Sequence, residues 1–147
     1  MKYKNWIALF SQTGCEVADL SEGINREPDF VITNADLDKT LITLNGWLRI
    51  VPASKCSVYN IYNGHPGLIT KYPELKGKDP QKRAWENIAS YAKIGSVVHK
   101  VAAEVDAGEV IVEKSTRTSR IYNLNKTYNA LRKTSFDAWL EFLKEHL

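Results

Sequence analysis

The chain has 147 residues, of which 44% are hydrophobic and 25% are charged, a composition typical of one soluble globular domain spanning residues 1–147. The net charge of +3 is too small to predict a nucleic-acid partner, and acidic residues interrupt the basic segment 71–83. No apolar run approaches the roughly 18 residues that cross a bilayer, and no signal peptide is recognisable. We therefore expect a cytoplasmic protein that binds neither nucleic acid nor membrane.

The first half of the chain has the pattern of a βαβ unit. Apolar runs at 6–10, 29–33 and 40–44 are typical of buried parallel strands, and the segment 16–25 predicts a short helix between the first two. A fourth β-rich run, 57–62, leads into the sequence Asn-Gly-His-Pro-Gly. This alternation predicts an α/β domain.

The second half predicts a helix over 80–92, with Asp79 as its N-cap and Gly95 ending it. Strands at 96–101 and 109–113 flank a turn and suggest an antiparallel sheet edge. A helix over 124–147 carries an apolar stripe typical of core packing: Tyr128, Leu131, Phe136, Trp139, Leu140 and Leu143. The predicted fold is a mainly parallel sheet with antiparallel edge strands and flanking helices.

Asn63 and His65 follow a predicted strand, at the sheet edge where open α/β folds bind their ligands. Gly64 permits unusual backbone angles beside His65, and Pro66 restricts the next ones. A histidine held in this way suits general acid-base chemistry, and the Asn63 amide suits donation to developing negative charge. The same composition is also that of a plain turn, so these residues alone leave both interpretations open.

Metal binding and thiol catalysis are two alternative chemistries. His65, His99 and Asp106 could converge, but no CxxC or HxxxH spacing is present, so we expect no metal site. Cys15 begins a predicted helix, where the helix dipole favours a thiolate, but the adjacent Glu16 opposes this. A packing role is the favoured interpretation of Cys15.

Three blocks of the sequence occur in a recognisable order: 44–51 (LNGWLRIV), 63–68 (NGHPGL) with 71–73 (KYP), and 95–99 (GSVVH) with 105–111 (VDAGEVI). They resemble the folate-dependent formyltransferases, above all the glycinamide ribonucleotide transformylases. In that family an Asn-x-His-Pro motif ends a central strand, and an Asp-x-Gly turn further along completes the site. Asp106 follows His65 by 41 residues, in agreement with this order.

The resemblance implies a Rossmann-like three-layer sandwich of the formyltransferase type. It implies that Asn63, His65 and Asp106 are catalytic, while His99 packs beside them. It also implies a co-substrate, 10-formyltetrahydrofolate, in a pocket closed by the backbone around Asp106. The remaining expected folate-binding residues are Leu48, Arg49, Ile50 and Val51.

The expected acceptor side departs from the family pattern. The family's first loop is rich in glycine and binds the phosphate of the acceptor, but here the corresponding residues are Gly14, Cys15 and Glu16. Glu16 places a negative charge where a phosphate is expected. Gly64, which we also expect to contact the acceptor, replaces a bulky apolar residue of the family motif. The donor side is therefore kept, and the acceptor side is altered.

The leading expectation is formyl transfer from 10-formyltetrahydrofolate to a small amine, nominally glycinamide ribonucleotide. N-formylation of an amino sugar or another small amine is the alternative that the altered loop favours. Hydrolysis of the formyl folate and a non-catalytic folate-binding remnant are further alternatives. The presence of Asn63, His65 and Asp106 together argues against a remnant. The sequence leaves room for a homodimer.

Overall fold

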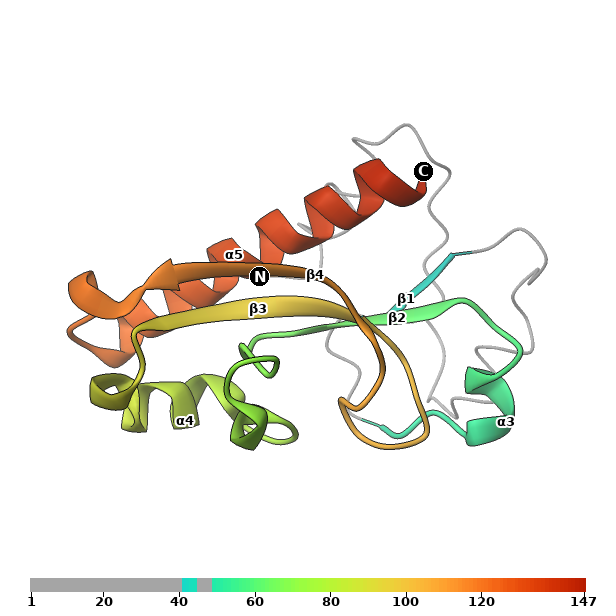
Figure 1. The fold of residues 1–147 in the computed structure, drawn as a ribbon, viewed down its shortest axis with the longest axis horizontal. Helices are drawn as coiled ribbons and strands as arrows, with labels where there is room; N and C mark the ends of the chain where they lie inside the picture. Colours follow the sequence, from blue (N-terminus) through green and yellow to red (C-terminus); the bar gives the residue numbers. More distant parts are fainter. Residues whose placement is uncertain (1–40, 45–48) are drawn as a thin grey trace, which may run out of the picture.

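The structure is a computed structural model, and it describes residues 41–44 and 49–147. Helices and short 3-10 turns (η) alternate with strands along this part of the chain (Figure 1). The elements are β1 (Ile42–Leu44), α3 (Ala53–Cys56), β2 (Ile61–His65), η1 (Pro73–Leu75), α4 (Pro80–Glu86), η2 (Ile88–Ser90), β3 (Lys93–Lys100), β4 (Val110–Arg117), η3 (Thr118–Arg120) and α5 (Leu124–His146).

The described strands form one mixed sheet in the order β1-β2-β3-β4. β1 and β2 are parallel, whereas β3 is antiparallel to both β2 and β4, which confirms the predicted antiparallel edge. The other predicted strands, 6–10 and 29–33, and the predicted helix 16–25 lie outside the described residues.

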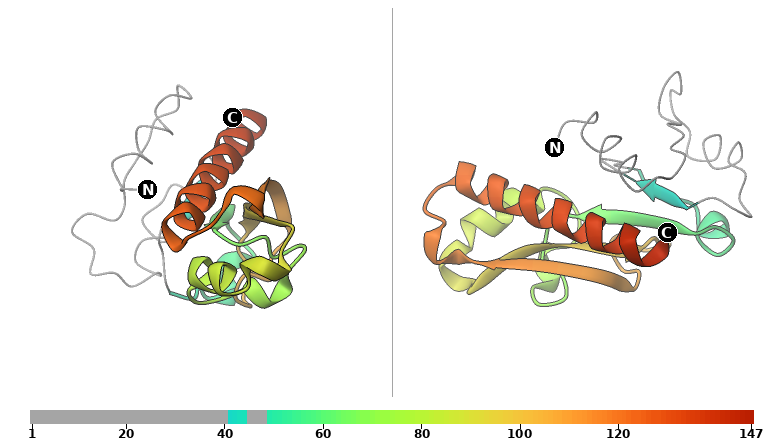
Figure 2. Two further views of the ribbon diagram at one scale, coloured as in Figure 1. Left: turned by 90° about the vertical axis from the view of Figure 1, so that its left-hand side faces the viewer. Right: turned by 90° about the horizontal axis from the view of Figure 1, so that it is seen from above.

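The long helix α5 lies along one face of the sheet (Figures 1 and 2). The turn η1 lies on the other face, where the Leu75 carbonyl bonds His65, and α4 packs against both η1 and α5. Alternate residues of β3 point to opposite faces, so Val98 packs with Trp139 and Phe142 of α5, while Val97 belongs to a second cluster with Ile69 and Leu75. The α5 side chains buried against the sheet include Leu131, Ala138, Trp139, Phe142 and Leu143.

The boundaries predicted for the strand before Asn63 are wrong. Residues 57–60 form a turn after α3, in which the amide of Ser57 bonds the carbonyl of Ala53 and the amide of Tyr59 bonds that of Lys55. β2 begins only at Ile61 and runs on through His65. Asn63 and His65 are therefore inside a strand rather than in a turn that follows it, and hydrogen bonds to β3 hold their backbone.

The helix predicted over 80–92 is also shorter than expected. α4 ends at Glu86, and both the amide and the side chain of the next residue, Asn87, donate to the Arg83 carbonyl in the last turn. Asp79 occupies the N-cap position, but its φ of 52° is left-handed and its side chain makes no capping hydrogen bond. Gly95 does not end this helix.

Gly95 lies inside β3, where an added Cβ would come within 2.1 Å of the Lys114 carbonyl oxygen. β3 and β4 are both longer than the predicted strands 96–101 and 109–113. Their pairing shifts register between Val98 and His99, a β-bulge near the loop that carries Asp106. Among the described residues, no helix is both long and apolar enough to cross a membrane.

Candidate active site

The pairing of β2 with β3 places three polar side chains on one face of the sheet. Asn63 is opposite His99, and His65 is opposite Val97. Directly opposed residues of an antiparallel pair project from the same face, and so do residues two apart in one strand. Asn63, His65 and His99 therefore share the face opposite to α5, on which the turn of residues 73–77 lies.

Gly64 lies between them and faces the other way, toward α5. A Cβ added there would come within 2.5 Å of Nε1 of Trp139 and 3.1 Å of the same ring's Cε2. The buried indole thus occupies the space that a larger residue would need. Close packing between β2 and α5 therefore explains why residue 64 is a glycine. A side chain at this position would point toward α5 and away from His65.

Asp106 reaches His65 from the loop between β3 and β4. Its φ of 51° is left-handed, an uncommon backbone state for a residue other than glycine that often accompanies a functional role. Oδ2 lies 3.1 Å from Nδ1 of His65 and accepts a hydrogen bond of 2.8 Å from the amide of Gly77. The side chains of His65 and Asp106 are only 6% and 8% exposed, so this pair is largely shielded from water.

His99 approaches Asp106 from the opposite side. Its Nε2 lies 3.4 Å from Oδ1 of Asp106 and is buried without a hydrogen-bond partner among the described residues. Its Nδ1 donates to the carbonyl of Lys100 at 2.9 Å. The carboxylate is therefore held between two imidazole rings.

Both ring nitrogens of His65 face hydrogen-bond acceptors. Nε2 lies 2.9 Å from the carbonyl oxygen of Leu75, which can only accept, and Nδ1 faces the Asp106 carboxylate. Burial lowers the pKa of His65, although Asp106 and the Leu75 carbonyl act in the opposite direction. A neutral ring carries one proton, so it can donate to only one of these two acceptors.

The surroundings of Asp106 favour the charged form of its carboxyl group, whereas burial disfavours the charged form of His65. Burial alone would raise the pKa of its carboxyl group, but the approach of His99 and His65 and the hydrogen bond from the Gly77 amide together lower it. An ionised Asp106 beside a histidine can orient the ring and accept a proton, the pairing that general acid-base catalysis uses.

Asn63 is half-buried, two residues before His65 on the same strand. Its side-chain amide forms no hydrogen bond with the residues that the structure describes, so its N–H groups can serve a ligand on this face. The structure thus brings His65, Asp106 and His99 into direct contact and places Asn63 on the same face.

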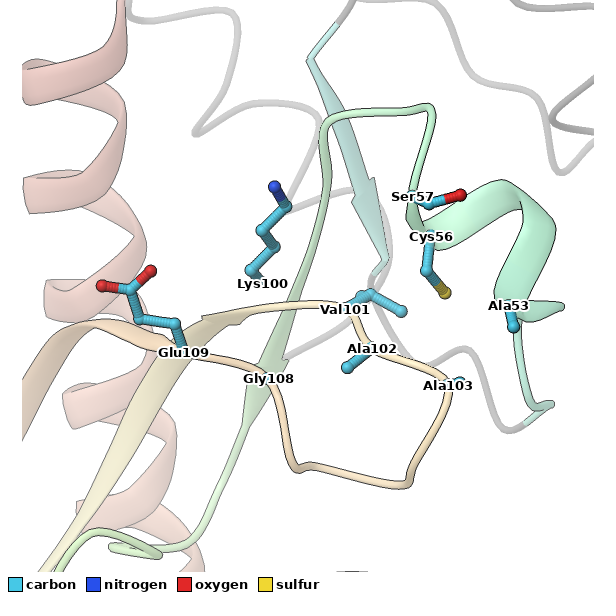
Figure 3. Close-up of a pocket in the computed structure, with 9 residues that line it drawn as sticks. All are labelled: Ala53, Cys56, Ser57, Lys100, Val101, Ala102, Ala103, Gly108 and Glu109. Carbon is cyan, nitrogen blue, oxygen red and sulfur yellow. The ribbon is translucent and has the colours of Figure 1, made fainter.

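A hollow of about 340 Å³ lies between α3 and the two arms of the Asp106 loop (Figure 3). The thiol of Cys56 points toward Val101 and Ala102 across this space, whereas the carboxylate of Glu109 points away from it. The complete lining is Ala53, Cys56, Ser57, Lys100, Val101, Ala102, Ala103, Gly108 and Glu109. Its wall is mainly apolar and lies beside the loop that carries Asp106, as a site for a ring-shaped ligand requires.

The described residues that we expect to bind folate differ in burial. Val51 is buried in a cluster with Ile42 and Ile61, whereas Arg49 and Ile50 are exposed just before α3. Leu48 lies outside the described residues, as do the acceptor-loop residues Gly14, Cys15 and Glu16.

Sequence reasoning missed three residues around the His65–Asp106 pair: Leu75, Gly77 and Arg83. Two of them act through backbone atoms, for which the sequence carries no side-chain signal. Among the described residues, no group of three or more histidine, cysteine, aspartate or glutamate side chains is arranged to hold a metal ion. His65 and His99 converge instead on opposite sides of the Asp106 carboxylate.

Comparison with known proteins gives relatives that are similar in sequence. A phosphoribosylglycinamide formyltransferase of Dictyostelium discoideum is 39% identical over 85 residues, which cover 50% of this chain and 39% of that protein. The chain therefore spans about two fifths of the length of this relative.

Solved structures share the fold. The phosphoribosylglycinamide formyltransferase of Streptococcus pneumoniae superposes with a TM-score of 0.69 at 20% identity, covering 99% of this chain and 82% of that one. The formyltransferase PseJ of Anoxybacillus kamchatkensis, in complex with UDP-4,6-dideoxy-4-formamido-L-AltNAc and tetrahydrofolate, gives a TM-score of 0.73 at 19% identity, covering 97% and 70%. The sequence profile described as formyl transferase matches residues 8–143. The chain therefore belongs to the formyl transferase family.

Proposed function

We propose that the protein transfers a formyl group from 10-formyltetrahydrofolate to a small amine. The observation that carries the proposal is the buried contact between His65 and Asp106, with the Asn63 amide on the same face. Membership of the formyl transferase family supports the reaction class. The hollow between α3 and the Asp106 loop is the proposed site of the folate's pterin ring.

In the proposed reaction, the amine nitrogen attacks the formyl carbon and the carbonyl oxygen becomes an oxyanion. Asn63 and His65 donate hydrogen bonds to this oxygen, which stabilises charge that exists only near the transition state. Asp106 orients His65 and, through a water molecule, accepts the proton that the attacking amine loses. The intermediate then collapses, the bond from carbon to N10 of the folate breaks, and N10 takes up a proton. The products are the formamide and tetrahydrofolate.

The observed hydrogen bond from Nε2 of His65 to the Leu75 carbonyl has a consequence for this step. Since Nδ1 faces Asp106, Nε2 is the nitrogen available for donation to the substrate. The ring must exchange the Leu75 oxygen for the formyl oxygen when the donor is bound. Substrate binding is therefore coupled to a small movement of the ring or of the turn that carries Leu75.

For the acceptor, we propose an amine that carries a neutral or cationic group where the family's acceptor carries phosphate. Glu16 supports this: two like charges about 4 Å apart repel by roughly 1 kcal/mol in water and by roughly 4 kcal/mol at an effective dielectric of 20. An amino sugar is the second candidate, since the PseJ structure, which shares this fold, contains a formamido sugar nucleotide.

A panel of amines tests the reaction and the acceptor together. Each amine is incubated with 10-formyltetrahydrofolate, and tetrahydrofolate and formamide are both quantified. We expect a lower kcat/KM for glycinamide ribonucleotide than for an unphosphorylated amine, and Glu16→Gln should raise the former selectively. Formamide with no amine of the panel would contradict formyl transfer, and tetrahydrofolate release without amine would indicate hydrolysis.

A further inference from the structure

Arg83 extends from α4 to the turn that follows the KYP motif and binds three consecutive backbone carbonyls there. Nη1 donates to the Glu74 carbonyl, and Nη2 donates to those of Lys76, at 2.8 Å, and Leu75, at 3.3 Å. Carbonyls at the end of a helical turn have no partner within the turn, and a guanidinium supplies several donors in a fixed geometry. Arg83 therefore fixes the backbone of residues 74–76 rather than any side chain.

The same turn holds both members of the buried pair. The Leu75 carbonyl accepts from Nε2 of His65, and the Gly77 amide donates to Oδ2 of Asp106. The Leu75 oxygen is shared by His65 and Arg83, which uses both lone pairs of one carbonyl. A shift of this turn would move the hydrogen-bond partners of His65 and Asp106 together.

The position of Arg83 leaves one of its buried donors without a partner among the described residues. Its Nε is buried and makes no hydrogen bond with the described residues. A buried donor without a partner destabilises the folded state, so such a group in a native fold calls for an explanation. By contrast, the neighbouring Lys82 is exposed and forms a surface ion pair with Glu86 at 3.7 Å.

We propose that Arg83 is a positioning residue for the His65–Asp106 pair: it clamps the turn of residues 74–76 so that the Leu75 carbonyl and the Gly77 amide hold the two side chains in register. When the ring of His65 turns to the formyl oxygen, Nη2 of Arg83 still satisfies the Leu75 carbonyl. The catalytic part of this inference rests on the proposed formyl transfer, and the structural part does not.

Among the described residues, three charged or titratable groups act on the pKa of His65, and their effects must be separated. Asp106 raises the pKa of His65, whereas His99 and the positive charge of Arg83 lower it. Arg83→Lys keeps the charge and removes the fork that binds three carbonyls. With the acceptor at Nε2 and the contact with Asp106 both loosened, the pKa of His65 should fall in this variant.

Nuclear magnetic resonance of the whole protein tests the clamp without relying on turnover. In the wild type, Nε2 of His65 should be protonated and its proton should exchange slowly with water. Arg83→Lys should lower the pKa of His65 by about one pH unit, the order of effect of one lost charge-assisted hydrogen bond. In Arg83→Lys and Arg83→Gln, the Gly77 amide should exchange at least ten times faster, while the Val98 amide in the sheet reports global opening. Lys82→Gln is the matched control and should change none of these.

An unchanged Gly77 exchange rate and His65 pKa in folded Arg83→Lys would overturn the proposal. An unprotonated, freely exchanging Nε2 in the wild type would overturn it even if no Arg83 variant folds.

If the amine panel identifies an acceptor, kcat should fall about tenfold in Arg83→Lys, while KM for the formyl folate should stay within about twofold of the wild-type value. The reason is that the reacting groups are misplaced while the folate pocket is intact. Absence of any turnover would count against the proposed function alone, since the resonance measurements would still decide the role of Arg83.

Discussion

Nδ1 of His65 lies 3.1 Å from Oδ2 of Asp106, although 41 residues separate them in the chain. The two side chains come from different elements, a central strand and a loop beyond the next strand. Their contact is shielded from water, which strengthens the electrostatic coupling between them. The following predictions test what this pair and its surroundings do.

Loss of either expected oxyanion donor should abolish most of the turnover. Asn63→Ala and His65→Gln should each lower kcat by about 100- to 1000-fold, the usual effect of removing one such donor. Steady-state assays with the best acceptor of the panel measure this. Asn125→Ala, on the exposed surface of α5, is the matched control and should retain full activity. Turnover near the wild-type value in either site variant would show that the residue does not stabilise the transition state.

Asp106→Asn should separate charge from backbone conformation. Asparagine tolerates the left-handed state that Asp106 adopts, and its amide oxygen can still accept from the Gly77 amide. We expect the melting temperature at pH 7 to stay within a few degrees of the wild type while kcat falls by about 100-fold or more. Asp106→Ala, which lacks the acceptor, should lose both activity and stability. An active Asn variant would argue against proton transfer through this carboxylate.

Stability should decrease as the pH falls below neutrality. Since burial holds the pKa of His65 below its ordinary value of 6.5, the unfolded chain binds more protons than the folded one as the pH falls through 6.5. The free energy of unfolding should therefore be lower at pH 5.5 than at pH 7.5. Urea titrations at both pH values should give a smaller difference for His65→Gln, because the other histidines are common to both proteins. A larger dependence in the variant would reverse the sign argued here. The lowered pKa of Asp106 adds a loss of stability only at more acidic pH, below its ordinary value of 3.8.

Gly64→Ala should destabilise the fold through Trp139. The added Cβ would lie 2.5 Å from Nε1 of the indole, so strand and helix must move apart, at a cost of about 1–3 kcal/mol. Denaturant unfolding of Gly64→Ala, Trp139→Phe and the double variant forms a thermodynamic cycle. We expect the double variant to be more stable than the sum of the single effects predicts, because the smaller ring makes room for the methyl group. Strict additivity would mean that the two residues do not compete for the same space.

Local patterns predicted much of this molecule. The apolar stripe of the last helix predicted α5, since a 3.6-residue period needs only neighbouring residues to be visible. The order of the motifs around Asn63, His65 and Asp106 was sufficient to predict the fold class. The turn between the last two predicted strands likewise predicted the antiparallel edge of the sheet.

Other features depended on contacts between distant parts of the chain. The start of β2 at Ile61 depends on pairing with β1 and β3, which the β-rich composition of 57–60 does not reveal. The reason for a glycine at position 64 is visible only in the fold, where Trp139, 75 residues away along the chain, occupies the space that a side chain would need. Its apparent place in an acceptor site came from the motif, whereas the structure gives it a packing partner.

The surroundings of the His65–Asp106 pair also combine features that the sequence reveals with features that only the fold reveals. His65 and Asp106 are recognisable in the sequence because their side chains have the functional groups that acid-base chemistry uses. Every residue supplies a backbone carbonyl, and every residue except proline supplies a backbone amide, so the residue types at 75 and 77 do not show that these groups contact His65 and Asp106. Only the folded chain determines which carbonyl and which amide face the pair, because the tertiary packing of the 73–77 turn against β2 and α4 sets their positions.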